Sequence, residues 1–196
     1  MPYFELQPDQ AELQQLAEEY WEQAGEKERQ LEREAFEAGK SIREGEYTLA
    51  NLEAIVRWKS ERIVHYLIAN SREMIQQALE VAAKPTATVQ EAVGALMSLR
   101  GVDLGIASAI LSAIYPDRYA VLDYRTLEGL GHERQDVEFY RQYLEYVQLM
   151  SGTGALTPQE GMPGPTTLHA FERALWAWSM RNASEARQRE LAESAQ

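Results

Sequence analysis

Apolar residues recur at helical spacing along nearly the whole chain. One stripe consists of Leu13, Leu16, Tyr20 and Trp21, and another of Leu52, Ile55, Val56, Ile63, Tyr66 and Leu67. An apolar residue at every third or fourth position is the pattern of an amphipathic helix. Alternation of β-branched residues, which would indicate strands, never extends beyond a few positions. The sequence therefore predicts an all-α fold.

Residues that favour helix N-termini precede four of the apolar stretches. They are Asp9 with Glu12, Thr48, Asn70 or Ser71, and Thr88 with Glu91. The two pairs that include a glutamate have the spacing of a capping box. We expect the helix after Thr48 to continue to about residue 69, and Gly25 to end or interrupt the first helix.

Three further segments carry specific expectations. The charged stretch of residues 26–40 has few apolar positions and is expected to form a solvated helix face. Gly94 stands inside a predicted helix at a cost of about 1 kcal/mol relative to alanine, which predicts a close contact there. An aromatic helix is expected to place its apolar residues in the core; they are Phe139, Tyr140, Tyr143, Tyr146 and Leu149.

The remaining segments complete the domain. Residues 1–182 are predicted to form a single domain, with an acidic N-terminal helical segment at 9–46 and a core at 47–180. Residues 151–166 are rich in glycine and proline, and loops of this length are usually lids, binding loops or disordered. Residues 183–196 are predicted to be a polar tail.

Residues 99–123, LRGVDLGIASAILSAIYPDRYAVLD, hold the most specific pattern in the chain. A glycine-containing turn precedes a hydrophobic helix, and a proline-marked loop then leads to Asp123. A helix N-terminus behind a tight turn presents unpaired backbone N–H groups and a positive dipole, so it can hold a phosphate. This pattern predicts a helical hairpin followed by a candidate catalytic carboxylate.

The segment resembles the helix-hairpin-helix (HhH-GPD) DNA glycosylase superfamily, which includes endonuclease III and the adenine glycosylases. In that family the hairpin reads roughly L-P-G-V-G-x-K-T-A, and an essential aspartate follows in V-D-T-H. The matching residues here are Leu99, Gly101, Val102, Ala107, Leu122 and Asp123. The interval of 22 positions from Gly101 to Asp123 is similar to that of the family. The resemblance implies a helical DNA glycosylase fold with Asp123 as the catalytic residue.

Several departures from the family pattern change what the resemblance implies. Asp103 replaces the second hairpin glycine and would repel a phosphate, and Gly105 occupies the position of the lyase lysine. Tyr124 and Arg125 replace the residues that follow the aspartate. Because the chain has no cysteine, it cannot hold the four-cysteine iron–sulfur cluster of the endonuclease III branch. The resemblance therefore implies a monofunctional enzyme with no cofactor.

Composition and charge set limits on the partners. The net charge is −12, whereas non-specific affinity for nucleic acid comes largely from lysine and arginine. Residues 9–46 hold twelve acidic and five basic side chains, but residues 47–125 hold eight of each. A small basic face is therefore compatible with the core, although scattered arginines are also typical of ordinary surface. We expect no membrane segment, a cytoplasmic location, no metal, and DNA as the partner; the oligomeric state is left open.

The candidate site residues fall into three groups. Asp123 is the candidate catalytic carboxylate, or alternatively only a helix N-cap. DNA contacts are expected from the side chains of Lys59, Arg100 and Arg125 and from the backbone of the hairpin residues Gly101, Val102, Asp103 and Gly105. A flipped base is expected to stack on Trp58, Tyr66 or Tyr124, although aromatic residues at helical spacing are more often core.

The sequence is thus interpreted as a DNA glycosylase-like hydrolase that cleaves the N-glycosidic bond of a modified or mispaired base. Two alternatives remain open. One is a non-catalytic helical module that binds DNA or a protein, and Asp103, Gly105 and the acidic charge favour it. The other is a hydrolase of a free nucleoside or nucleotide, which needs no strong affinity for DNA.

Overall fold

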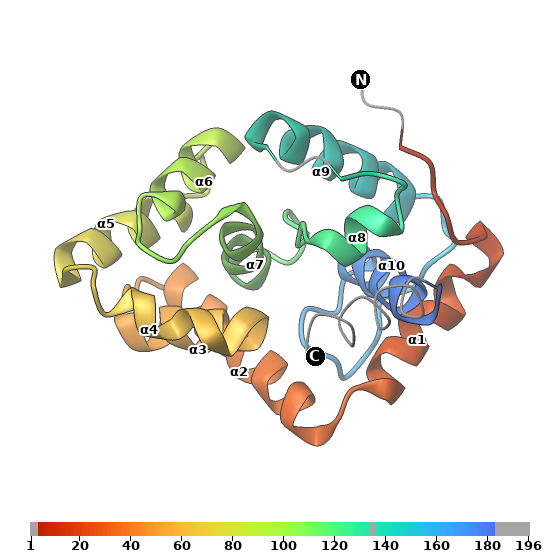
Figure 1. The fold of residues 1–196 in the computed structure, drawn as a ribbon, viewed down its shortest axis with the longest axis horizontal. Coiled ribbons are helices and arrows are strands. Elements are labelled where there is room, and N and C mark those ends of the chain that lie inside the picture. The colour runs from red at the N-terminus through yellow and green to blue at the C-terminus, as the bar shows by residue number, and fades with distance from the viewer. Residues whose placement is uncertain (1–3, 134–135, 183–196) are drawn as a thin grey trace, which may run out of the picture.

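The computed structural model describes residues 4–133 and 136–182, and the regular structure in these ranges is helical (Figure 1). The α-helices are α1 (Leu13–Gln23), α2 (Glu26–Arg43), α3 (Leu49–Ser60), α4 (Val64–Leu67), α5 (Arg72–Ala82), α6 (Val89–Met97), α7 (Leu104–Ile114), α8 (Tyr124–Glu128), α9 (Val137–Ser151) and α10 (Thr167–Asn182). Short 3-10 turns lie at Gln10–Glu12 and Glu61–Ile63. The all-α prediction is confirmed.

The helices form two groups that face each other (Figure 1). In the first group α2 packs on α3 and α7, and α5 packs on α6. In the second group α1 and α8 pack on α10, and α9 lies against the same helix. The first and last described helices, α1 and α10, are thus neighbours, and the chain between them makes the other group before it returns.

Helix α7 lies deep within the first group. Every residue of α7 except Gly105 is buried. Gly39 of α2 sits directly on it, since a Cβ atom at Gly39 would lie 2.1 Å from the carbonyl oxygen of Ala113. The absence of a side chain at this position therefore lets α2 and α7 approach within backbone contact.

Most of the predicted helix starts are found where the sequence places them. Thr48 and Ser71 cap α3 and α5, and Thr88 with Glu91 forms a capping box on α6. Gly25 separates α1 from α2, as expected. Asp9 caps only the 3-10 turn before α1, through the backbone N–H of Ala11, and its predicted box with Glu12 does not form.

The helix predicted from Thr48 to about residue 69 is interrupted at Ser60. The backbone of Ser60 is extended, with φ −163° and ψ 96°, so a 3-10 turn and the short α4 follow it in place of a continuous helix. Tyr66, expected to point inward, is consequently 51% exposed.

Residues 26–40 form a helix whose charged side chains are mostly exposed, as expected, but this helix is not solvated on all sides. One side of α2 is buried against α3 and α7, and the buried positions are Glu32, Ala35, Ala38, Gly39 and Ile42. The prediction holds for the charged face and misses the buried side, because small residues and a paired glutamate can be buried as well as large apolar side chains.

Two other expectations also fail. A Cβ atom at Gly94 would meet no atom within 4 Å, so this glycine marks no close contact. On α9, Phe139, Tyr140 and Tyr143 are buried, but Leu149 is 70% exposed, because it lies on the opposite side of the helix from the core.

The glycine- and proline-rich segment, here residues 152–166, is fastened to the helices around it. Thr157 N–H donates to the side chain of Gln14 at 2.9 Å, and Thr166 Oγ1 donates to the carbonyl of Pro116 at 2.9 Å. The predicted tail of residues 183–196 lies outside the described residues. Within the described ranges, no helix has the length and apolar character needed to cross a lipid bilayer.

Candidate functional site

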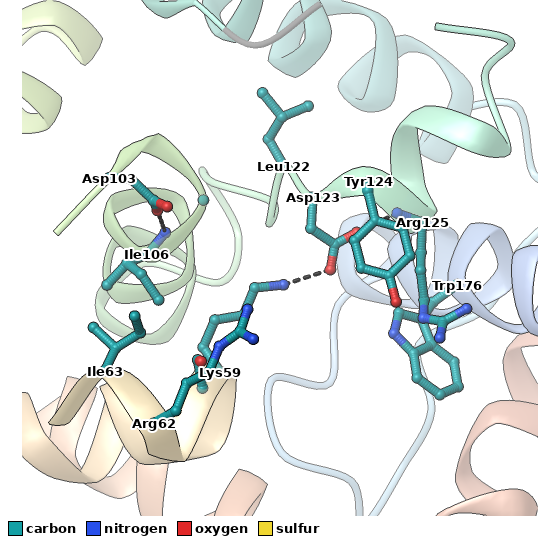
Figure 2. Close-up of a pocket in the computed structure, with 12 residues that line it drawn as sticks. Lys59, Arg62, Ile63, Asp103, Ile106, Leu122, Asp123, Tyr124, Arg125 and Trp176 are labelled. Carbon is teal, nitrogen blue, oxygen red and sulfur yellow. Dashed lines mark hydrogen bonds and ion pairs between the residues drawn. The ribbon is translucent and has the colours of Figure 1, made fainter. Parts of the chain in front are cut away.

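A cavity of about 350 Å³ lies between the two helix groups (Figure 2). One wall comes from the end of α3 and the turn after it, and a second from the start of α7. The opposite wall comes from residues 122–125 and from Trp176 of α10. The break at Ser60 contributes to this geometry, because Lys59, Ser60, Arg62 and Ile63 all line the cavity.

Asp123 stands at the edge of this cavity, as the N-cap of α8. Its Oδ1 accepts hydrogen bonds from the backbone N–H groups of Arg125 and Thr126, both at 3.0 Å. The Thr126 hydroxyl in turn accepts the N–H of Asp123 at 2.9 Å, which completes a capping box. The N-cap role considered for Asp123 is confirmed, and it fixes the orientation of the carboxylate.

Lys59 Nζ donates to the other oxygen of Asp123, and both side chains are largely buried. Burial alone would raise the pKa of Asp123. The ammonium of Lys59 and the two backbone N–H groups outweigh burial and lower the pKa below its ordinary value of 3.8. Asp123 therefore carries its negative charge throughout the neutral pH range.

The segment before Asp123 is held in place by side chains of other elements. Residues 119–122 are buried and have no helical structure. The N–H of Val121 donates to Glu172 at 2.9 Å, and the N–H of Leu122 donates to the hydroxyl of Ser108 at 2.9 Å. Tyr143 donates to the carbonyl of Val121 at 2.8 Å. These hydrogen bonds satisfy backbone groups that have no partner in a helix or a sheet, so the segment that leads to Asp123 is held rigidly.

Arg125 lies between two aromatic rings on the same wall. Its guanidinium carbon is 4.9 Å from the ring centre of Tyr124 and 5.0 Å from that of Trp176. Arg62, on the opposite side, is exposed. With Lys59, these arginines give the cavity three cationic side chains against the two carboxylates of Asp103 and Asp123.

The connection between α6 and α7 forms a tight turn, and Asp103 caps α7. Asp103 Oδ1 accepts the N–H of Ile106 at 2.8 Å, so the carboxylate satisfies one of the backbone N–H groups in the first turn of α7. Gly101 has φ +87°, and a Cβ atom there would lie 2.7 Å from Cβ of Tyr66. A left-handed conformation and this close approach together explain the glycine.

A second cavity, of about 550 Å³, adjoins the first. Its lining includes Trp58, Tyr20, Leu31, Met180, Glu172 and Arg173, and it shares Lys59, Asp123 and Trp176 with the first cavity. The Lys59–Asp123 pair thus borders both spaces.

Glu172 and Arg173, which line the second cavity, belong to a buried ionic network. Arg173 donates to Glu32 at 2.6 Å and to Gln159 at 3.1 Å. His169 Nδ1 lies 3.0 Å from Glu172 Oε2. Burial alone would lower the pKa of His169, but the neighbouring carboxylates of Glu172 and Glu32 raise it above its ordinary value of 6.5.

Some of the residues predicted for the site come together and others do not. Lys59, Asp103, Gly105, Asp123, Tyr124 and Arg125 line the first cavity, and Trp58 lines the second. Arg100, Gly101, Val102 and Tyr66 line neither. Val102 is buried, and the backbone N–H and carbonyl of Arg100 are both bonded to the Asn70 side chain.

Glu172, Arg173 and Glu32 were not predicted as site residues from the sequence. His169 and Glu172 have the i, i+3 spacing of helix neighbours, which is the one local signal for this group. The pairing of Arg173 with Glu32 spans 141 positions and could not be inferred from spacing. Comparisons with protein-family models, with curated proteins and with solved structures found no match to this chain.

Proposed function

We propose that this protein cleaves the N-glycosidic bond of a modified or mispaired base in DNA, with Asp123 as the essential carboxylate. The observation that carries the proposal is the ionised, rigidly held Asp123 at the border of two adjoining cavities. Departure of a base leaves positive charge on the sugar, and a fixed negative charge beside C1′ stabilises it.

The charge state of Asp123 favours one role over another. An efficient general base has a pKa near the working pH, whereas the pKa of Asp123 is lowered. The carboxylate is therefore better suited to electrostatic stabilisation of the cationic sugar than to removal of a proton from water.

The surroundings of Asp123 are compatible with a nucleic-acid strand. Arg62 is exposed at the first cavity, and Arg125 is held there by Tyr124 and Trp176, so both are available for phosphates. Asp103 opposes a phosphate at the start of α7. We therefore assign the phosphate contacts to the two arginines rather than to the hairpin amides.

A second candidate activity, strand cleavage through a lysine, is favoured by the position of Lys59. The resemblance places the lyase lysine at Gly105, and Lys59 of α3 lines the same cavity as Gly105. In its ion pair with Asp123, however, the Lys59 nitrogen is protonated and has no lone pair for attack on a sugar. Hydrolysis is therefore the first proposal.

The test is a panel of duplexes, each with one modified or mismatched base, assayed for released base and for abasic sites. Base release with an intact strand supports hydrolysis. Any covalent protein–DNA adduct trapped by borohydride should then be at least as abundant with Lys59→Gln as with wild type. Adduct formed by wild type and lost in Lys59→Gln would establish the lyase activity.

The same assay, extended to free deoxynucleosides, separates the remaining alternatives. Cleavage of free deoxynucleosides without cleavage of any duplex would establish the nucleoside hydrolase. Binding to duplexes without release of any base would contradict the proposal and favour a non-catalytic module.

A further inference from the structure

We propose that the second cavity receives a flat heteroaromatic base and that Glu172 selects bases with an N–H donor on the ring edge. This inference rests on the proposed function for the role of the ring as a base to be released. It adds a specificity-determining residue that lies outside the segment resembling the glycosylases.

The cavity has aromatic and apolar walls. Trp58 of α3 and Trp176 of α10 contribute to its lining from different helix groups, and Tyr20, Leu31 and Met180 add further apolar surface. A cavity of about 550 Å³ with a mainly apolar lining and a few placed polar groups is typical of a small-molecule site. Stacking on indole rings favours a flat ring of any nucleobase type.

The Lys59–Asp123 pair lies where this cavity meets the first one. A base in the second cavity would consequently have its sugar near Asp123 and its phosphates toward Arg62 and Arg125. The two cavities together therefore offer separate spaces for the base and for the backbone of one extruded nucleotide.

Several side chains with acceptor oxygens line this cavity, and Glu172 is the one whose orientation is fixed by hydrogen bonds to one of its two oxygens. Its Oε2 accepts the N–H of Val121 at 2.9 Å and lies 3.0 Å from His169 Nδ1, so the side chain cannot turn freely. No hydrogen bond within the described residues ends on Oε1, and 11% of the side chain is exposed. By contrast, both oxygens of Asp123 already have donors.

A carboxylate oxygen accepts hydrogen bonds and cannot donate them. A ring that carries an amino group or a ring N–H can donate to Glu172 and is therefore favoured. A ring that carries only acceptors is disfavoured, because its lone pairs repel the carboxylate and the carboxylate loses its solvation without gaining a hydrogen bond. Glu172 thus acts on the choice of ring, while Asp123 acts on the bond to the sugar.

The test measures binding of model bases to the complete protein by NMR, using the indole N–H signals of its four tryptophans. The probes are 9-methyladenine, 9-methylguanine, 1-methylcytosine and 1-methyluracil, each of which has an N–H donor. The control probe, 9-methylpurine, has the ring but no N–H donor. We expect at least one probe to shift the signals of Trp58 and Trp176 and to bind about tenfold or more tightly than 9-methylpurine.

Variants link the binding to the cavity and to Glu172. Glu172→Gln replaces the free acceptor oxygen by an amide donor, so it should remove the advantage over 9-methylpurine while 9-methylpurine binds at least as well as before. Ala24→Phe fills the cavity from its half-buried rim and should abolish the shifts. Ala69→Phe, at an exposed position that lines neither cavity, is the matched control and should leave binding unchanged.

Absence of any saturable shift at Trp58 and Trp176 would overturn the assignment of the cavity. A preference for donor-bearing probes that survives in Glu172→Gln would overturn the role of Glu172. Because neither result depends on bond cleavage, failure of this inference is distinguishable from failure of the proposed function. Base binding without any base release would leave the inference standing and contradict the proposed function.

Discussion

At the scale of single residues, the site depends on how Asp123 keeps its charge in a largely buried position. An isolated buried carboxylate would take up a proton, since burial raises its pKa. Here Lys59 supplies an opposite charge and α8 supplies two backbone N–H groups. The resulting low pKa means that Asp123 stabilises the fold above its unfolded-state pKa, and that this stabilisation is lost as the pH falls through the folded-state value.

Removal of Lys59 should raise the pKa of Asp123. In Lys59→Gln the carboxylate loses its counter-charge but keeps its burial and its two amide donors, whereas Lys59→Arg keeps a positive charge at this position. NMR titration of the carboxyl carbon of Asp123 should give a higher pKa in Lys59→Gln than in Lys59→Arg or wild type. A midpoint in Lys59→Gln no higher than in wild type would show that the lysine does not control the charge.

At the scale of helices, two glycines that look equivalent in the sequence have opposite roles. Gly39 of α2 lies against the backbone of α7, whereas Gly94 of α6 is exposed, with no neighbour near its missing side chain. From the sequence we expected the close contact at Gly94. Spacing alone cannot show which face of a helix meets another backbone, because that depends on how the helices pack.

The two glycines therefore predict opposite effects of the same substitution. Gly39→Ala should lower the free energy of unfolding by about 1–3 kcal/mol, because α2 and α7 must move apart. Gly94→Ala should raise it by about 0.5–1 kcal/mol, because alanine favours the helix and costs nothing in contacts. Denaturant unfolding of both variants checks the pair, and equal effects in the same direction would contradict the packing of α2 on α7.

The difference between local contacts and contacts between distant segments explains which parts of the fold and the site could be predicted. Helix starts at Thr48, Ser71, Thr88 and Asp123 follow from local chemistry, and all four are found. The proximity of Lys59 to Asp123 joins residues 64 positions apart, and the burial of Glu32 depends on a partner in α10. Such contacts arise only when distant segments of the chain pack together. The sequence therefore predicted a DNA contact for Lys59 but not its position beside Asp123.

At the scale of the whole molecule, a chain with net charge −12 must concentrate its positive charge to bind DNA. Arg62 and Arg125 line the cavity on opposite walls, while many acidic side chains lie on α2 and elsewhere. Binding should therefore involve few phosphates and decrease only modestly with salt, in contrast to a protein with an extended basic surface.

This view predicts how salt affects binding to a duplex that carries an abasic analogue. Arg62→Gln and Arg125→Gln should each reduce the slope of log affinity against log salt by about 1. Arg141→Gln is the matched control, because Arg141 lies on α9, is paired with Glu138 and Glu145, and lines neither cavity. An equal change in all three variants, measured by fluorescence anisotropy, would contradict a local phosphate site.

We propose that the charge of Asp123, rather than its role as a helix cap, promotes base release. The single-turnover rate of base release in Asp123→Asn separates the two roles, because asparagine caps a helix as well as aspartate does but carries no charge. The control is Asp136→Asn, the same substitution at the N-cap of α9. We predict a rate about 10²–10³ lower for Asp123→Asn and an unchanged rate for Asp136→Asn. Base release by Asp123→Asn at nearly the wild-type rate would contradict the account.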